Sequence, residues 1–145
     1  HDGAPLHCAR CRFAAFGNAC PMERSYFATL LALLLHQIDA AFWREWEMFL
    51  LPGGVQGFLV FNLLAVGLVL LGYRHVLLQT SRARGFAMVC AGLGIATFLI
   101  HLGFAVFGHR AFHLPLSMTV IATCLVSAVC LLRSLRTVAR MRTRT

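Results

Sequence analysis

The sequence predicts an all-α integral membrane protein, an antiparallel bundle of four transmembrane helices joined by short loops. Hydrophobic residues make up 59% of the 145 residues and charged residues only 12%, whereas soluble domains average about 45–50% and about 25%. A soluble domain of this length leaves ~30% of its chain surface exposed, which is too much for so apolar a composition. Four apolar stretches approach the roughly 20 residues that a helix needs to cross a bilayer. The breaks between them are short, and short connections favour antiparallel neighbours.

The four predicted spans are preceded by a polar arm and followed by an arginine-rich tail. The second, third and fourth spans have cores without any charged residue, whereas polar residues interrupt the far end of the first. Pro52-Gly53-Gly54 breaks the chain after the first span, and Pro115 opens the last. The cysteine-containing arm is either an extension upstream of a native start at Met22 or a genuine cytosolic segment. The predicted boundaries are 1–22 for the arm, 23–133 for the membrane domain with spans at about 24–46, 55–77, 86–107 and 114–133, and 134–145 for the tail.

The placement of the arginines orients the bundle. With four spans, both termini and the middle loop share one side of the membrane, and that side carries eleven of the thirteen arginines. Because an excess of Lys and Arg marks cytoplasmic loops, we expect both termini in the cytoplasm. Trp43 and Trp46 then fit the aromatic belt at the outer interface. The formal net charge of +8 is explained by the membrane and does not indicate nucleic acid as a partner.

The stretch from Arg133 to Arg144 holds five arginines in twelve residues. Near an anionic inner leaflet each basic residue contributes about 1 kcal/mol of attraction, so membrane lipids are the expected partner of this tail. The alternative is docking to an acidic face of a larger membrane protein complex. In that case the small bundle would be a structural or accessory subunit.

Polar residues of the first three spans fall at one depth in the outer half of the membrane. His36 and Asp39 are three residues apart and share a helix face. Asn62 and His101, in the second and third spans, lie about as deep as His36, ~10 Å below the outer boundary at ~1.5 Å per residue. An ionisable group within a span costs ~2.5–3.5 kcal/mol and is a functional-site hypothesis by default. We therefore expect these four residues to form a ligand-binding layer.

Several interpretations of this layer stay open. One is a transition-metal site held by His36, Asp39 and His101, since imidazole with carboxylate suits zinc, iron or copper. A second is a haem b with His36 and His101 as axial ligands. The others are hydrogen bonds that only hold the helices together, and a path for protons or ions. Further metal ligands are expected among the acids and histidines of the outer end, which are Glu45, Glu47, His109 and His113.

The arm offers a separate set of metal ligands. Cys8 and Cys11 have the C-x2-C spacing of zinc sites, and Cys20 and His7 would complete the four ligands of a tetrahedral site. The later spacing departs from the standard motifs, and the alternative is an unstructured arm with reduced thiols. The sequence contains no Gly-rich phosphate loop, H-E-x-x-H motif or nucleophile elbow. Whether the protein is an enzyme therefore stays open.

The stretch HQIDAAFWREWEMF, which begins at His36, resembles the signature of a family of small, uncharacterised bacterial membrane proteins with four spans. Leu51-Pro52-Gly53-Gly54 follows it and belongs to the same signature. The resemblance runs from about Met22 to the fourth span. It implies the four-span fold and a place in a bacterial inner membrane, and it brings no established activity. It implies that a functional site should be sought in the H-x-x-D…E-W-E segment.

Overall fold

The computed structural model describes residues 21–50, 52–107 and 113–142 of the chain. All regular structure within these residues is helical, and no strand occurs there. Four helices are long and apolar enough to cross a membrane, which confirms the predicted fold class. The elements are α1 (Pro21–Phe42), the short α2 (Glu45–Met48), α3 (Gly54–Leu77), α4 (Ala83–Val106) and α5 (Pro115–Arg142).

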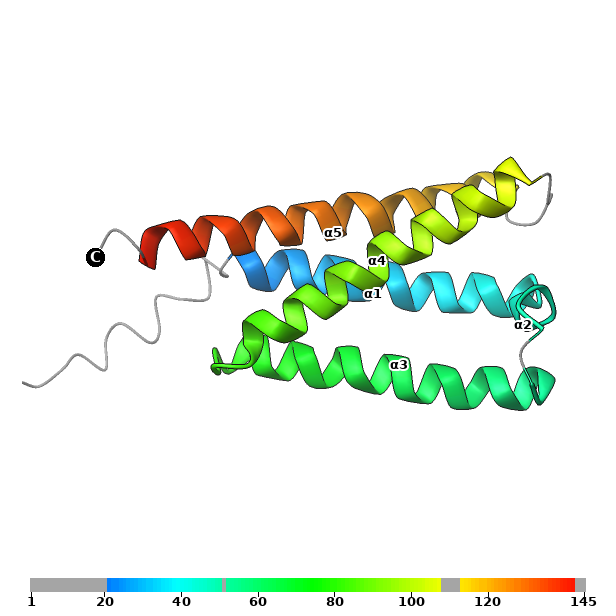
Figure 1. Cartoon of the computed structure of the whole chain (residues 1–145), viewed down its shortest axis with the longest axis horizontal. Coiled ribbons are helices and arrows are strands. Elements are labelled where there is room, and N and C mark those ends of the chain that lie inside the picture. The colour runs from blue at the N-terminus through cyan, green and yellow to red at the C-terminus, as the bar shows by residue number, and fades with distance from the viewer. Residues whose placement is uncertain (1–20, 51, 108–112, 143–145) are drawn as a thin grey trace, which may run out of the picture.

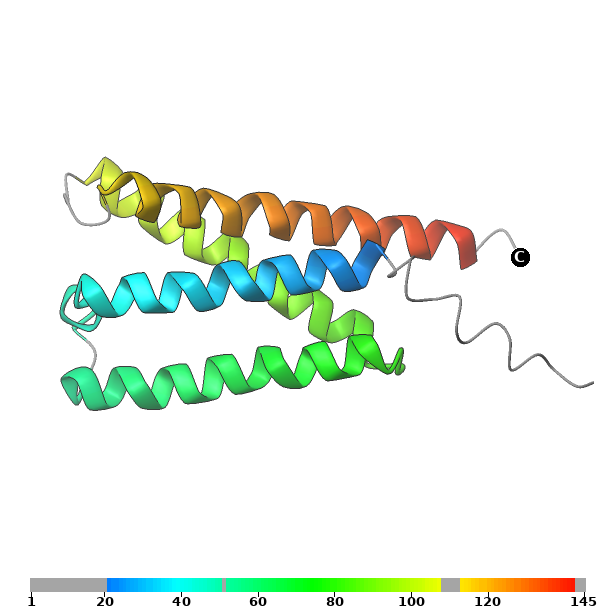
Figure 2. The same cartoon turned by 180° about the vertical axis from the view of Figure 1, so that it is seen from behind.

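The long helices run alternately in opposite directions (Figure 1). In the view of Figure 1, α5, α1 and α3 lie one below the other, and α4 crosses them obliquely. The same order is seen from behind (Figure 2), where α4 lies beyond α1. One end of the bundle holds the start of α1, the end of α5 and the turn between α3 and α4. The other end holds α2, and the site described below lies there.

Two helices have limits that differ from the predicted ones. The first ends at Phe42 and not near residue 46, because Arg44 adopts a left-handed backbone conformation with φ 54° and ψ 46°. A residue with positive φ cannot continue a right-handed helix, so Glu45–Met48 forms a separate turn. The last helix, α5, is longer than predicted, since it extends to Arg142 and does not end at about residue 133. Its C-terminal part contains neither Gly nor Pro and is rich in arginine, which is a good helix former.

The helices are held together by close approaches of small and aromatic residues. The Tyr26 hydroxyl of α1 is fully buried and donates a hydrogen bond to the Val69 carbonyl of α3 at 2.8 Å. On α4, Gly94 lies against both α5 and α1, since a Cβ placed there would be 2.8 Å from the Cys124 carbonyl oxygen and 3.3 Å from a Thr29 methyl group. Small residues that allow such approaches are typical of packed membrane helices. These contacts join α1 to α3, and α4 to both α1 and α5.

Candidate metal-binding site

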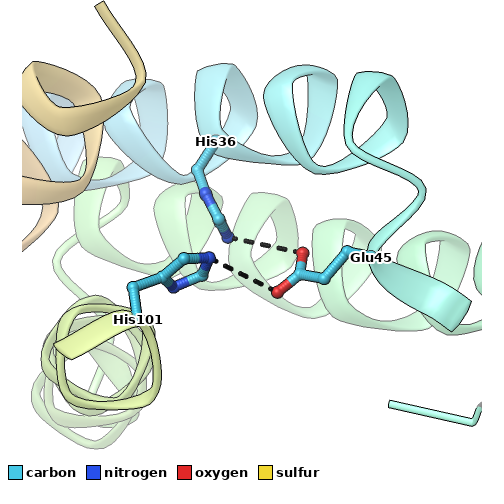
Figure 3. A group of neighbouring side chains, drawn as sticks. All are labelled: His36, Glu45 and His101. Atoms are coloured by element: carbon cyan, nitrogen blue, oxygen red, sulfur yellow. Dashed lines mark ion pairs between the residues drawn. The ribbon is translucent and has the colours of Figure 1, made fainter. Parts of the chain in front are cut away.

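Two histidines and one glutamate converge at the α2 end of the bundle (Figure 3). The Nε2 atom of His36 lies 3.8 Å from Glu45 Oε2, and the Nε2 atom of His101 lies 3.6 Å from Glu45 Oε1. The two imidazole rings are nearly perpendicular, with centroids 4.8 Å apart. One donor atom from each of the three residues lies within 4.8 Å of the other two. Three different elements thus supply one compact group of donors.

The backbone explains why these residues meet. His36 lies six residues before the end of α1 and His101 five residues before the end of α4. At ~1.5 Å per residue both rings sit roughly 8–9 Å from the same end of the bundle. Glu45 would point elsewhere if α1 continued, but the left-handed turn at Arg44 reverses the chain. The short helix α2 then directs the Glu45 carboxylate back between the two rings (Figure 3).

A hydrogen bond defines the tautomer of His101. Its Nδ1 atom lies 2.7 Å from the Thr97 carbonyl oxygen, one helical turn earlier. A carbonyl oxygen only accepts, so Nδ1 carries the proton and donates it. In the neutral ring the lone pair is therefore on Nε2, the atom that faces Glu45. Histidines that bind metals commonly donate their other ring N–H to a backbone carbonyl in this way.

All three residues are buried. His36 is 3% exposed, and Glu45 and His101 are each 7% exposed. Burial and, to a smaller extent, the charge of Asp39 raise the pKa of Glu45, which lies outside the membrane-spanning segments, to about 7. A buried carboxylate is costly unless a positive charge or hydrogen-bond donors compensate it. A cation between the carboxylate and the imidazole lone pairs would supply that compensation.

The donor set fits a small transition-metal ion. Two histidines and one carboxylate hold the metal in several zinc hydrolases and in non-haem iron oxygenases. With bonds of about 2.1 Å, tetrahedral ligands stand roughly 3.4 Å apart. The donors of this group lie within 4.8 Å of one another, so they would need to close in by up to about 1.4 Å. A haem fits worse, because its plane would have to pass between two rings whose centroids are 4.8 Å apart. The Glu45 carboxylate also faces both rings there.

The cluster forms the polar end of an apolar cavity of about 460 Å³. Segments of α1, α3 and α4 form its walls, and α2 together with Phe49 covers its end. His36, Glu45 and His101 all line it. A bound ion would therefore face an open space and would not be enclosed by protein on every side.

Asp39 and Asn62 are not part of the three-residue group. The Ser117 hydroxyl of α5 donates a hydrogen bond to Asp39 Oδ1 at 2.8 Å, and Ser117 Oγ accepts one from Trp43 Nε1 at 3.4 Å. This chain of hydrogen bonds joins α1 to α5. The Asn62 amide donates to the Phe58 carbonyl of its own helix at 2.9 Å, and Asn62 does not line the cavity. Their remaining oxygens, Asp39 Oδ2 and Asn62 Oδ1, accept no hydrogen bond from the described residues.

The other predicted ligands lie at the surface or outside the described residues. Glu47 is exposed and forms an ion pair with Arg44, and His113 is exposed and packs against Trp43 with ring centroids 5.2 Å apart. The residues of the predicted ligand sets that fall outside the described residues are His7, Cys8, Cys11, Cys20 and His109. Sequence reasoning missed Thr97 as the hydrogen-bond partner of His101, although a spacing of four residues on one helix is a visible signal. It also missed Ser117 as the partner of Asp39, although the place of Ser117 at the start of α5 is another.

The fold and the site together define a multi-pass helical membrane protein with a buried cluster of two histidines and one glutamate near one membrane boundary. The chain belongs to the family of unknown function DUF6713, whose model matches residues 22–138. The match covers the four membrane-spanning helices and all three residues of the cluster. No curated protein and no solved structure matches the chain.

Proposed function

We propose that this protein binds a divalent transition-metal ion through His36, Glu45 and His101. The observation that carries the proposal is the convergence of two imidazole Nε2 atoms on one buried carboxylate, with the tautomer of His101 set by Thr97. Imidazole and carboxylate together suit zinc, iron and copper. Three protein ligands leave at least one coordination position open, as in catalytic and not in structural zinc sites.

A role limited to helix packing is the competing account, because a protonated Glu45 could join two helices by hydrogen bonds. The distances argue against it. Both Nε2–carboxylate separations, 3.6 and 3.8 Å, exceed the about 2.7–3.2 Å of N–H···O hydrogen bonds. The space between the atoms is larger than a shared proton needs and suits an ion with bonds of about 2.0–2.2 Å to each of them.

Metal content tests the proposal directly. The protein purified in mild detergent and loaded with Zn²⁺ or Co²⁺ is expected to retain one ion per chain by elemental analysis. His36→Ala and His101→Ala should each abolish this retention, because two ligands rarely hold a divalent ion against dialysis. His113→Ala, which removes an exposed imidazole near the same end, should leave it unchanged. Equal retention in all four proteins, or none in the wild type, would overturn the proposal.

We further propose that the site faces the outside of a bacterial inner membrane. The described arginines at the opposite end of the bundle support this orientation, since Arg74, Arg82 and Arg84 flank the turn between α3 and α4 and positive residues favour the cytoplasmic side. The same argument places the arginine-rich end of α5 at the anionic inner leaflet.

The orientation is testable with two single cysteines in a background whose native cysteines are replaced. An impermeant thiol reagent added outside intact cells should label a cysteine at the exposed Gln56 and leave one at the exposed Ser81 unlabelled until the cells are opened. Gln56 lies near the start of α3, and Ser81 lies in the turn that follows the end of this helix, so the two positions mark opposite ends of the bundle. The reverse labelling pattern would show that the site faces the cytoplasm.

A further inference from the structure

The cavity beside the cluster has apolar walls over nearly its whole length. Among the described residues that line it, the only polar side-chain groups outside the cluster belong to Gln37, Trp46 and Thr97. The rest of the wall consists of Leu, Ile, Val, Ala and Phe side chains. Ligand pockets typically have volumes of about 300–1,000 Å³ and combine apolar walls with a few polar groups. At about 460 Å³, this cavity has the size and the polarity of such a pocket.

The cavity reaches the lipid-facing surface of the bundle. Phe61 of α3 and Ile100 of α4 line it, and they are 52% and 42% exposed. In a helix that crosses a bilayer, side chains exposed at this depth face lipid. A molecule dissolved in the membrane could therefore enter between α3 and α4 without passing through water.

We propose that the cavity binds an amphiphile from the membrane, with an apolar tail along α3 and a single oxygen head that fills the open position of the bound metal ion. This inference rests on the proposed metal site. The walls select the tail, because they offer it no hydrogen-bond partners. The ion selects the head, because zinc and iron bind hydroxyl, carbonyl or carboxylate oxygen at positions the protein leaves open.

The test uses Co²⁺-loaded protein, whose visible absorption changes when a new ligand reaches the metal. Octanoate is expected to change the spectrum at a concentration at least tenfold below that of acetate, since only octanoate can fill the cavity. A parallel titration of octanol against ethanol shows whether a neutral head serves as well. A response to either long-chain probe at lower concentration than to its short analogue supports the proposal.

Two variants on α3, which supplies no metal ligand, separate the cavity from the metal. Ala65→Phe fills the cavity and should remove the advantage of octanoate over acetate while leaving Co²⁺ binding intact. Leu64→Phe adds the same ring at a neighbouring position that is 69% exposed and outside the cavity, so it should behave as wild type. Detergent micelles take up octanoate to the same extent with either variant, so the comparison of the two variants controls for this uptake.

The outcomes distinguish this inference from the proposed metal site on which it rests. Co²⁺ binding with equal responses to octanoate and acetate, and to octanol and ethanol, would overturn the amphiphile and leave the metal site standing. Retention of the octanoate advantage in Ala65→Phe would overturn the assignment to this cavity. Failure of wild-type protein to bind Co²⁺ would overturn both.

Discussion

Replacement of Glu45 by glutamine is expected to lower the affinity of the protein for Zn²⁺ or Co²⁺ by roughly 100-fold or more. Loss of even an indirect partner of a metal ligand commonly costs 10–100-fold, and Glu45 is the only anionic member of the group. The fold should survive, because the pKa of about 7 means that the buried side chain already tolerates its neutral form, which glutamine resembles. Competition with a chelator of known affinity measures the change.

Glu47→Gln is the matched control for this experiment. Glu47 lies in the same short helix, but it is exposed and pairs with Arg44 at the surface. We expect its removal to change metal affinity by less than a factor of about five, since exposed ion pairs contribute only about 0.2–1 kcal/mol. Similar losses in the two variants would mean that general negative charge attracts the ion and that Glu45 is not a direct ligand.

Replacement of Gly94 by leucine is expected to destabilise the bundle by about 3 kcal/mol or more, at or above the upper end of the usual cost of overpacking. The added Cβ would lie 2.8 Å from the Cys124 carbonyl oxygen and 3.0 Å from the Ala128 Cβ atom. Both belong to the body of α5, so no flexible side chain can move aside. The helices α4 and α5 would have to separate, and the midpoint of thermal unfolding in detergent should fall.

Gly92→Leu provides the control on the same helix. A Cβ at Gly92 would meet nothing within 4 Å, so leucine there should leave stability unchanged or raise it slightly, because glycine is a poor helix former. If the two substitutions lower the unfolding midpoint equally, α4 does not pack against α5 through Gly94. The described arrangement of the helices would then be wrong.

The helical fold was accessible from the sequence because it depends on composition and on segment length. Apolar stretches near 20 residues leave few alternatives in a bilayer, and Pro52 and Pro115 mark helix boundaries through their covalent structure. The end of α1 was harder to predict. A left-handed conformation at Arg44 is uncommon for a residue with a side chain, and tertiary contacts such as the hydrogen bond from Trp43 to Ser117 support the turn.

The composition of the candidate site depends on that turn. The spacing of His36 and Asp39 places them on one helix face, and similar depth pairs His36 with His101, so the sequence indicated where polar groups gather. It could not indicate that the chain reverses after Trp43 and brings Glu45 to the two rings. Nor could the sequence show that the Asp39 carboxylate accepts a hydrogen bond from Ser117 of α5. Both features follow from contacts between residues distant in sequence, which periodicity does not encode.

X-ray absorption spectroscopy of the Zn²⁺-loaded protein tests the central claim most directly, because it reports the atoms bound to the metal. We expect a shell of nitrogen and oxygen at about 2.0–2.1 Å, with the outer scattering of two imidazole rings, and the loss of one ring's contribution or of the metal itself in His101→Ala. A shell dominated by sulfur at about 2.3 Å would place the ion on cysteines. That result, or a shell without imidazole, would contradict a site formed by His36, Glu45 and His101.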